Sequence, residues 1–199
     1  MDKQLSDKLA DAIWVAKTLF DRQKVSGSSA NLSFLHEGCI YITASGTCFG
    51  RLTDESFACV KPDGSYEGQA PSKELPLHKI YYGKNSGIQA VLHTHSFYST
   101  LWSCLPHENE ADVMPSYTPY LKMKLGTVGM IPYAKPGSQE LFRLFDEKKT
   151  ENDGFLLANH GPIVGGKDLL SVFYIMEELE ESSRIAWELR SGGGRLIEK

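Results

Sequence analysis

The sequence predicts one α/β or α+β domain in which helices cover a central sheet. The chain has 199 residues, enough for a single domain with a substantial core. Short segments with the alternating pattern of strands outnumber helices early in the chain. Longer segments with the apolar periodicity of helices bracket these strands.

The first predicted element is an amphipathic helix over residues 5–24. Short strands follow at residues 32–35, 39–43 and 57–60, and a turn at residues 61–65 leads into a partner segment. The helix is predicted from apolar side chains that recur on one face: Leu5, Leu9, Ala12, Ile13, Ala16, Leu19 and Phe20.

The middle of the chain alternates helices with one apolar strand. A helix is expected over residues 72–82 with Ser72 as its N-cap, and a strand over residues 89–95. Ser96 is expected to cap a helix over residues 97–105. Residues 106–127, which include Pro106, Pro115 and Pro119, are predicted to be irregular, and long loops of this kind are more often functional or interfacial than idle.

The last third is predicted to hold strands at residues 128–133 and 154–158, a helix at residues 138–149 and extended chain at residues 162–164. Asp168 can cap a final helix that runs to about residue 190. The tail after residue 191 is expected to be loose. The acidic side chains of the last helix are predicted to form a solvated face: Glu177, Glu178, Glu180 and Glu181.

Composition excludes several classes of partner. The chain has 21 Lys and Arg against 25 Asp and Glu, a net charge of −4, and no basic run, so neither nucleic acid nor an anionic membrane is an expected partner. No apolar stretch approaches the ~20 residues that span a bilayer. The first residues lack the build of a signal peptide, so we expect a cytoplasmic protein.

The cysteines show no Cys-x-x-Cys spacing and are predicted to pack as small apolar residues: Cys39, Cys48, Cys59 and Cys104.

Three histidines and one carboxylate form a candidate metal site. His93 and His95 lie two residues apart at the end of an apolar run, and side chains at i and i+2 of a strand leave the same face. A third histidine, His160, stands where another apolar run breaks at a glycine, and Glu74 could act as a fourth ligand or a base. Imidazole is the commonest protein ligand for zinc-like ions. For His78, four residues after Glu74, a structural hydrogen-bonding role is preferred to a ligand role.

Three small-residue segments could bind an anion such as phosphate. Residues 26–31 and 43–47 are rich in glycine and hydroxyl side chains, which suit turns as well as anions. Ser72 and Lys73 stand at a predicted helix start, where free N–H groups favour negative charge.

The chain resembles the class II aldolase/adducin family along nearly its whole length, and these segments belong to the motifs that carry the resemblance. Five motifs follow in the family's order: Ser29-Ala30-Asn31-Leu32-Ser33, Thr43-Ala44-Ser45-Gly46, Ser72-Lys73-Glu74, His93-Thr94-His95 and His160-Gly161. Two positions depart from the pattern, Ala30 for the usual glycine and Ala44 for the usual proline. Alanine resists positive φ, so Ala30 bears on the conformation of the first loop.

One branch of the family, the 3-oxo-tetronate 4-phosphate decarboxylases of bacterial acid-sugar catabolism, is most similar. That resemblance rests on residues 71–78, 118–124, 131–137, 157–162 and 177–181.

The resemblance implies a mixed α/β domain over residues 1–199 with a central, mainly antiparallel sheet. It implies a divalent metal, zinc in the first place with manganese or cobalt as alternatives, held by His93, His95 and His160 with Glu74 beside it. It further implies a homotetramer with fourfold symmetry and sites at the subunit boundaries, where Tyr117 or Tyr120 could reach a neighbour's site. The substrate phosphate would be held by Asn31, Ser45, Gly46, Ser72 and Lys73.

The implied reaction is a carbon–carbon lyase reaction on a small phosphorylated acid sugar or ketose. Decarboxylation of a 3-oxo-tetronate 4-phosphate would give dihydroxyacetone phosphate through an enediolate that the metal stabilises. Glu74 would supply the proton as general acid, and Tyr120 is a further candidate catalytic residue.

Several alternatives stay open at this stage. A sugar-phosphate aldolase of the fuculose or ribulose phosphate type, or a related epimerase, could share the enediolate. The dehydratase branch that acts on methylthioribulose phosphate is another option. An adducin-like interaction domain is less favoured, since it has no need for three histidines and a carboxylate. A closed structural zinc site would fit thiolates better than this set of donors.

Overall fold

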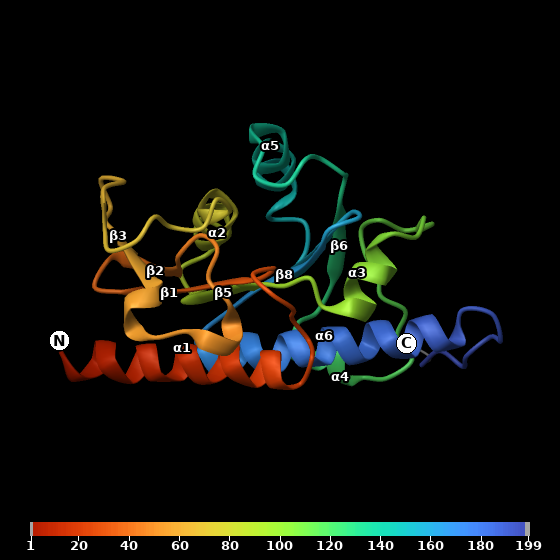
Figure 1. Ribbon diagram of the computed structural model, residues 1–199. Coiled ribbons are helices and arrows are strands. Elements are labelled where there is room, and N and C mark those ends of the chain that lie inside the picture. Colours follow the sequence, from red (N-terminus) through yellow and green to blue (C-terminus); the bar gives the residue numbers. More distant parts are fainter. Residues whose placement is uncertain (1, 198–199) are drawn as a thin grey trace.

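The computed structural model describes residues 2–197 and shows a single sheet between layers of helices (Figure 1). The sheet has eight strands in the order β4-β3-β2-β1-β5-β8-β7-β6. The strands are β1 (Asn31–His36), β2 (Cys39–Thr43), β3 (Phe57–Val60), β4 (Tyr66–Glu67), β5 (Ala90–His93), β6 (Val128–Ile131), β7 (Gly154–Leu157) and β8 (Gly161–Gly166). The α-helices are α1 (Lys3–Asp21), α2 (Leu75–Tyr82), α3 (Phe97–Ser103), α4 (Tyr120–Lys124), α5 (Gln139–Lys148) and α6 (Leu169–Leu189).

Neighbouring strands of the sheet pair antiparallel at every position except β6 and β7, which are parallel. The expected mixed, mainly antiparallel sheet flanked by helices is confirmed. Two short 3₁₀ helices, Phe49–Arg51 and Asp54–Ser56, fill the connection between β2 and β3.

Two hydrophobic cores hold the helical layers to opposite faces of the sheet. The long helices α1 and α6 lie along one face, while α2 and α5 cover the other (Figure 1). Leu32 and Phe34 of β1 belong to the core on the α1 and α6 side. Val91 of β5 and Leu77 of α2 belong to the core on the other side. Because side chains alternate along a strand, β1 contributes apolar residues to the α1 and α6 side and turns polar side chains to the other side, where the end of β5 adds His93.

Most helix ends match the sequence. Ser138 and Asp168 accept hydrogen bonds from the backbone N–H groups of Leu141 and Ser171, as N-caps of α5 and α6 should. The helix expected from Ser72 instead begins at Leu75, with Glu74 at the N-cap position. The segment predicted to be irregular contains α4, a single helical turn. The chain after residue 191 forms only turns and irregular structure up to residue 197.

The prediction of a solvated acidic face on the last helix is wrong at Glu180, which is buried. This side chain is 2% exposed. Its carboxylate accepts hydrogen bonds from the backbone N–H of Tyr98 at 3.0 Å, and from the N–H and hydroxyl of Ser99 at 2.9 and 2.8 Å. Ser96 stands at the N-cap position of α3 but makes no capping hydrogen bond with its side chain. Glu180 supplies the acceptor instead and ties α3 to α6, immediately after the loop that carries His95.

Replacing Glu180 with glutamine is therefore expected to lower the free energy of unfolding by about 2 kcal/mol or more, because an amide NH₂ would face backbone donors in a buried site. Chemical denaturation measures the change. Glu181→Gln, on the exposed face of the same helix, is the matched control and is expected to resemble the wild type. Equal stability of the two variants would contradict the capping role.

Other expectations from the sequence have clear outcomes. The four cysteines are free; Cys39, Cys48 and Cys59 are half-buried, whereas Cys104 is exposed and does not pack in the core as predicted. Within residues 2–197, none of the helices combines the length and the apolar character needed to cross a bilayer.

Candidate active site

The sheet places the first site residues opposite one another. Asn31 at the start of β1 pairs directly with His93 at the end of β5, so both side chains leave the same face, the one covered by α2. His93 is the last residue of β5, which ends two residues before the predicted end of the strand at residue 95. His95 follows in the connection to α3, yet the rings of His93 and His95 still approach to 5.1 Å between centroids.

The third histidine comes from the turn between β7 and β8. Asn159 adopts a positive φ of 56° and redirects the chain just before His160. Gly161 follows with a φ of 149°, and a Cβ there would lie 2.4 Å from the carbonyl oxygen of Thr94. Only glycine lets this turn lie directly against the His93–His95 segment, so the His160-Gly161 pair has a steric cause.

The donor atoms of these residues converge. The Nε2 atoms of His93 and His160 are 3.3 Å apart. Glu74 Oε2 lies 3.3 Å from His93 Nε2, and Glu74 Oε1 lies 3.4 Å from His160 Nε2. The nearest ligand atoms of His93, His95 and His160 all lie within 4.8 Å of one another. His93 is fully buried and His160 is 6% exposed, while His95 is exposed. The cluster is therefore open to solvent on the His95 side.

Desolvation by the surrounding protein favours the neutral form of these three histidines. It lowers the pKa of His93 to about 3, with the neighbouring His95 acting in the same direction. Burial also lowers the pKa of His160 to about 3, helped by His93 and opposed by Glu74. The surrounding protein lowers the pKa of His95 as well, against the effect of Glu74. Neutral imidazole has a free lone pair at pH 7, which is the form that binds a cation.

The residues fit a divalent cation. His93 Nδ1 donates to the carbonyl oxygen of Pro162 at 2.8 Å, so Nε2 carries the lone pair. That lone pair faces a Glu74 oxygen, another acceptor, and two acceptors at this distance are unfavourable without a cation or a proton between them. Tetrahedral donors about 2.0–2.1 Å from a zinc-like ion lie roughly 3.3–3.4 Å from each other, which matches the separations at Glu74 and His160. The histidine–carboxylate cluster, defined as His93, His95, His160 and Glu74, can hold such an ion.

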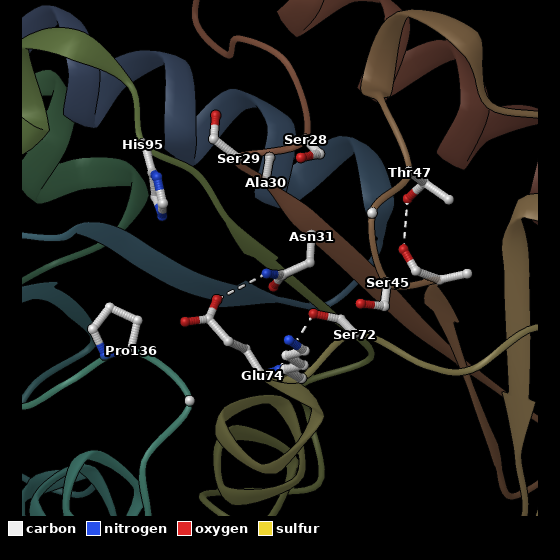
Figure 2. Close-up of a pocket in the computed structure, with 14 residues that line it drawn as sticks. Ser28, Ser29, Ala30, Asn31, Ser45, Thr47, Ser72, Glu74, His95 and Pro136 are labelled. Carbon is white, nitrogen blue, oxygen red and sulfur yellow. Dashed lines mark hydrogen bonds between the residues drawn. The ribbon is translucent and has the colours of Figure 1, made fainter.

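A polar cavity of about 250 Å³ opens beside this cluster (Figure 2). Glu74 and His95 belong to its wall, and the Asn31 amide points from the opposite side toward the Glu74 carboxylate (Figure 2). All five residues predicted to hold a phosphate line it. The complete lining is Ser28, Ser29, Ala30, Asn31, Ala44, Ser45, Gly46, Thr47, Ser72, Lys73, Glu74, His95, Pro136 and Gly137.

Backbone hydrogen bonds join the turns of the cavity wall. The Ser45 N–H donates to the backbone carbonyl oxygen of Ala70 at 2.9 Å, and the Ser72 N–H donates to the backbone carbonyl oxygen of Thr43 at 3.2 Å. Gly46 adopts a φ of 79°, which a side chain would oppose. In the described part of the chain the positive-φ residues other than glycine are Gln23, Glu37 and Asn159, so the alanine at position 30 imposes no such strain.

Three outcomes go beyond the expectations or depart from them. The Ser72 hydroxyl accepts from the Glu74 N–H at 3.3 Å and so orients the catalytic candidate rather than capping the helix. Pro136 and Gly137 form part of the wall, although they were not among the predicted site residues and only contributed to the family resemblance through residues 131–137. Tyr120 is 56% exposed at the start of α4 and does not line this cavity, so its role stays a prediction tied to a second copy of the chain.

His78 has the structural role preferred for it. The ring is fully buried on α2, with Nε2 2.5 Å from the Asn31 Oδ1 and Nδ1 2.6 Å from the Ser33 hydroxyl. It is not part of the histidine–carboxylate cluster.

Comparisons with known proteins agree with this geometry. Residues 10–187 match the sequence profile described as the class II aldolase and adducin N-terminal domain. The chain is 38% identical over 177 residues to the 3-oxo-tetronate 4-phosphate decarboxylase of Escherichia coli (strain K12), covering 88% of this chain and 84% of that protein. It is 34% identical over 173 residues to the L-fuculose phosphate aldolase of Methanocaldococcus jannaschii, covering 87% of this chain and 92% of that one.

A solved structure is similar over almost the whole length. The crystal structure of YgbL from Klebsiella pneumoniae, a protein with aldolase, epimerase and decarboxylase as its candidate activities, superposes with a TM-score of 0.92 at 32% identity. The superposition covers 97% of this chain and 94% of YgbL.

Proposed function

The chain belongs to the class II aldolase and adducin family, and on that premise we propose that it decarboxylates a 3-oxo-tetronate 4-phosphate to dihydroxyacetone phosphate and carbon dioxide. Decarboxylases and aldolases both cleave a carbon–carbon bond, so the protein is a carbon–carbon lyase. One observation carries the proposal: His95 and Glu74 belong both to the histidine–carboxylate cluster and to the wall of the polar cavity. A substrate with its phosphate in the cavity can therefore present its far end to the cluster.

The structure of the substrate favours cleavage of the bond between its carboxylate carbon and the adjacent carbon. Its carboxylate lies beta to a ketone, so loss of carbon dioxide leaves an electron pair that the ketone can accept. The resulting anion is the enediolate of dihydroxyacetone phosphate. One proton on the carbon that carried the carboxylate completes the product, so the site must stabilise an oxyanion and deliver a proton.

The three histidines and Glu74 supply both functions. A divalent cation at this position, zinc in our proposal with manganese or cobalt as alternatives, acts as a Lewis acid toward the charge that develops on the substrate oxygens. His93, His95 and His160 would hold it through neutral nitrogens, which leaves its positive charge undiminished. Glu74 carries the proton to the enediolate carbon as general acid, since it is the carboxylate that reaches both the cluster and the cavity.

The cavity wall orients the substrate from its other end. We assign the phosphate to Asn31, Ser45, Gly46, Ser72 and Lys73, which line the cavity together. Hydroxyl and backbone N–H donors with one lysine cation suit a phosphate dianion. Fixing the phosphate converts proton transfer into a reaction between groups already in position.

Further expectations from the sequence belong to the same proposal. They are a homotetramer with fourfold symmetry, a site that Tyr117 or Tyr120 of a neighbouring copy completes, and a cytoplasmic location. The exposed position of Tyr120 is compatible with contact to a second copy.

A sugar-phosphate aldolase is the second candidate, because the aldolase relative is 34% identical over 87% of the chain and retro-aldol cleavage reaches the same enediolate. An adducin-like interaction domain is disfavoured by the convergence of three histidines and a carboxylate at one point.

The distinguishing experiment compares substrates at matched metal concentration and pH. We expect a 3-oxo-tetronate 4-phosphate to give dihydroxyacetone phosphate and carbon dioxide in equal amounts, without an aldehyde. Fuculose 1-phosphate and ribulose phosphates should be cleaved far more slowly. A coupled assay for dihydroxyacetone phosphate measures both. Faster release from a ketose phosphate, with an aldehyde as co-product, would leave the aldolase as the better assignment.

A further inference from the structure

A line of buried polar side chains runs from Glu74 away from the cavity. The Asn31 Nδ2 lies 2.9 Å from Glu74 Oε2 (Figure 2), and the Asn31 Oδ1 lies 2.5 Å from His78 Nε2. The other ring nitrogen of His78 is 2.6 Å from the Ser33 hydroxyl, which is itself 2.7 Å from the Tyr82 hydroxyl. Buried polar groups linked in this way restrict one another's orientation.

The secondary structure builds this line. Asn31 and Ser33 are two residues apart on β1, so both face α2. His78 projects from α2 between them, and Tyr82, one turn further along the helix, reaches Ser33. One imidazole thus joins two side chains of the same strand, and neither Ser33 nor His78 has any exposed surface.

The hydrogen bonds of this line can run in only one direction. Glu74 Oε2 accepts from the Asn31 NH₂, and it can do so whether or not the other carboxylate oxygen carries a proton, so the Asn31 amide turns its oxygen toward His78. His78 Nε2 must then carry the ring proton, and Nδ1 accepts from the Ser33 hydroxyl. The Ser33 oxygen in turn accepts from Tyr82. Burial and the neighbouring His93 hold the pKa of His78 at about 3, so the ring has one donor and one acceptor at neutral pH, as this direction requires.

We propose that His78 is a positioning residue for Glu74, acting through the Asn31 amide. With the ring proton on Nε2, the amide cannot rotate without placing its oxygen against the carboxylate and its NH₂ against a donor. The Glu74 carboxylate is thereby held on the cavity side of the histidine cluster, in reach of the substrate carbon. This inference rests on the proposed function, since it assumes that Glu74 transfers the proton.

The test is a double-mutant cycle between positions 78 and 74. His78→Leu is expected to lower kcat roughly tenfold or more, because a misplaced proton donor slows the chemical step. Bound metal should stay within about twofold of the wild type, since the histidine cluster is not changed. KM should change less than kcat, because Asn31 is the one residue assigned to the phosphate that His78 contacts. In the Glu74→Gln background the same substitution should cost less than about twofold, because the group that it positions no longer transfers a proton. His78→Gln, which can still donate to the Asn31 oxygen, should recover much of the loss.

Two further variants guard against a folding defect. Ser33→Ala removes the donor that fixes the ring tautomer, with little change in volume, and should lower kcat about threefold or more, again only when Glu74 is present. Lys79→Ala, on the exposed side of the same helix, should behave as the wild type. Exchange of dihydroxyacetone phosphate protons with D₂O gives a second readout, since it needs proton transfer but no carbon–carbon cleavage.

Equal fold losses in the two Glu74 backgrounds would overturn the inference, because they would indicate a general structural effect. Unchanged kcat in folded His78→Leu, or in Ser33→Ala if His78→Leu does not fold, would overturn it as well. If Glu74→Gln itself turns over near the wild-type rate, the assigned role of Glu74 fails and the inference fails with it. If Glu74→Gln is impaired while the His78 and Ser33 variants are not, only the positioning role fails.

Discussion

Glu74→Gln is expected to lower turnover by about a hundredfold or more while phosphate-bearing ligands still bind. Glutamine keeps the size of the side chain and can still accept from Asn31, but it cannot carry a proton to carbon. The residues assigned to the phosphate are unchanged. Steady-state turnover of the 3-oxo-tetronate 4-phosphate, together with calorimetric binding of dihydroxyacetone phosphate, measures the two effects separately.

Glu181→Gln makes the same chemical change on an exposed helix face and is the control for that experiment. Near-normal turnover of Glu74→Gln would show that another group moves the proton. Bound metal should be determined in the same preparation. The Glu74 oxygens lie within 3.4 Å of the histidine nitrogens, so the loss of one of them would also lower the affinity for the ion.

Replacing any one of His93, His95 and His160 with alanine is expected to lower metal content and turnover together. In the proposed site three neutral nitrogens would share the ion, and a site left with two of them and one carboxylate should hold it far less tightly. His95→Ala is the cleanest variant, because this side chain is exposed and its loss leaves no buried cavity. Elemental analysis of dialysed protein, alongside the activity assay, gives both quantities.

His107→Ala provides the matched control for the histidine series. His107 lies outside the cluster, where its ring contacts Trp102, and it should keep both metal and rate. A histidine variant of the cluster with full metal and an unchanged rate would remove that residue from the proposed ligand set.

The sequence predicted the local elements well but gave no prediction of the order of the strands in the sheet. Apolar periodicity located the helices and most strands, because each reflects burial along its own length. The strand order of the sheet is set by pairing between distant segments. β5, for example, lies between β1 and β8, and no pattern within Ala90–His93 specifies those neighbours without the family resemblance.

The convergence of His93 and His95 in the histidine–carboxylate cluster was predictable because their spacing has a direct geometric meaning. Two histidines at i and i+2 share a face even though the strand ends at His93. Glu180 was misjudged for the opposite reason. A glutamate among other glutamates has the pattern of a wet helix face, and nothing in that pattern reveals the unpaired N–H groups of α3 that it covers. The line of buried polar side chains from Asn31 to Tyr82 could not be predicted from the sequence either, since it joins a strand to a helix more than forty residues away along the sequence.

The most direct measurement of the central claim, a metal-dependent lyase site at the histidine–carboxylate cluster, is a metal titration of chelated enzyme. Protein stripped with a chelator is titrated with zinc, manganese or cobalt, and bound metal and the rate of dihydroxyacetone phosphate release are recorded on the same samples. We expect no turnover without metal, and a rate that rises with occupancy and levels off at about one ion for each set of three histidines. Full turnover by metal-free protein would contradict it.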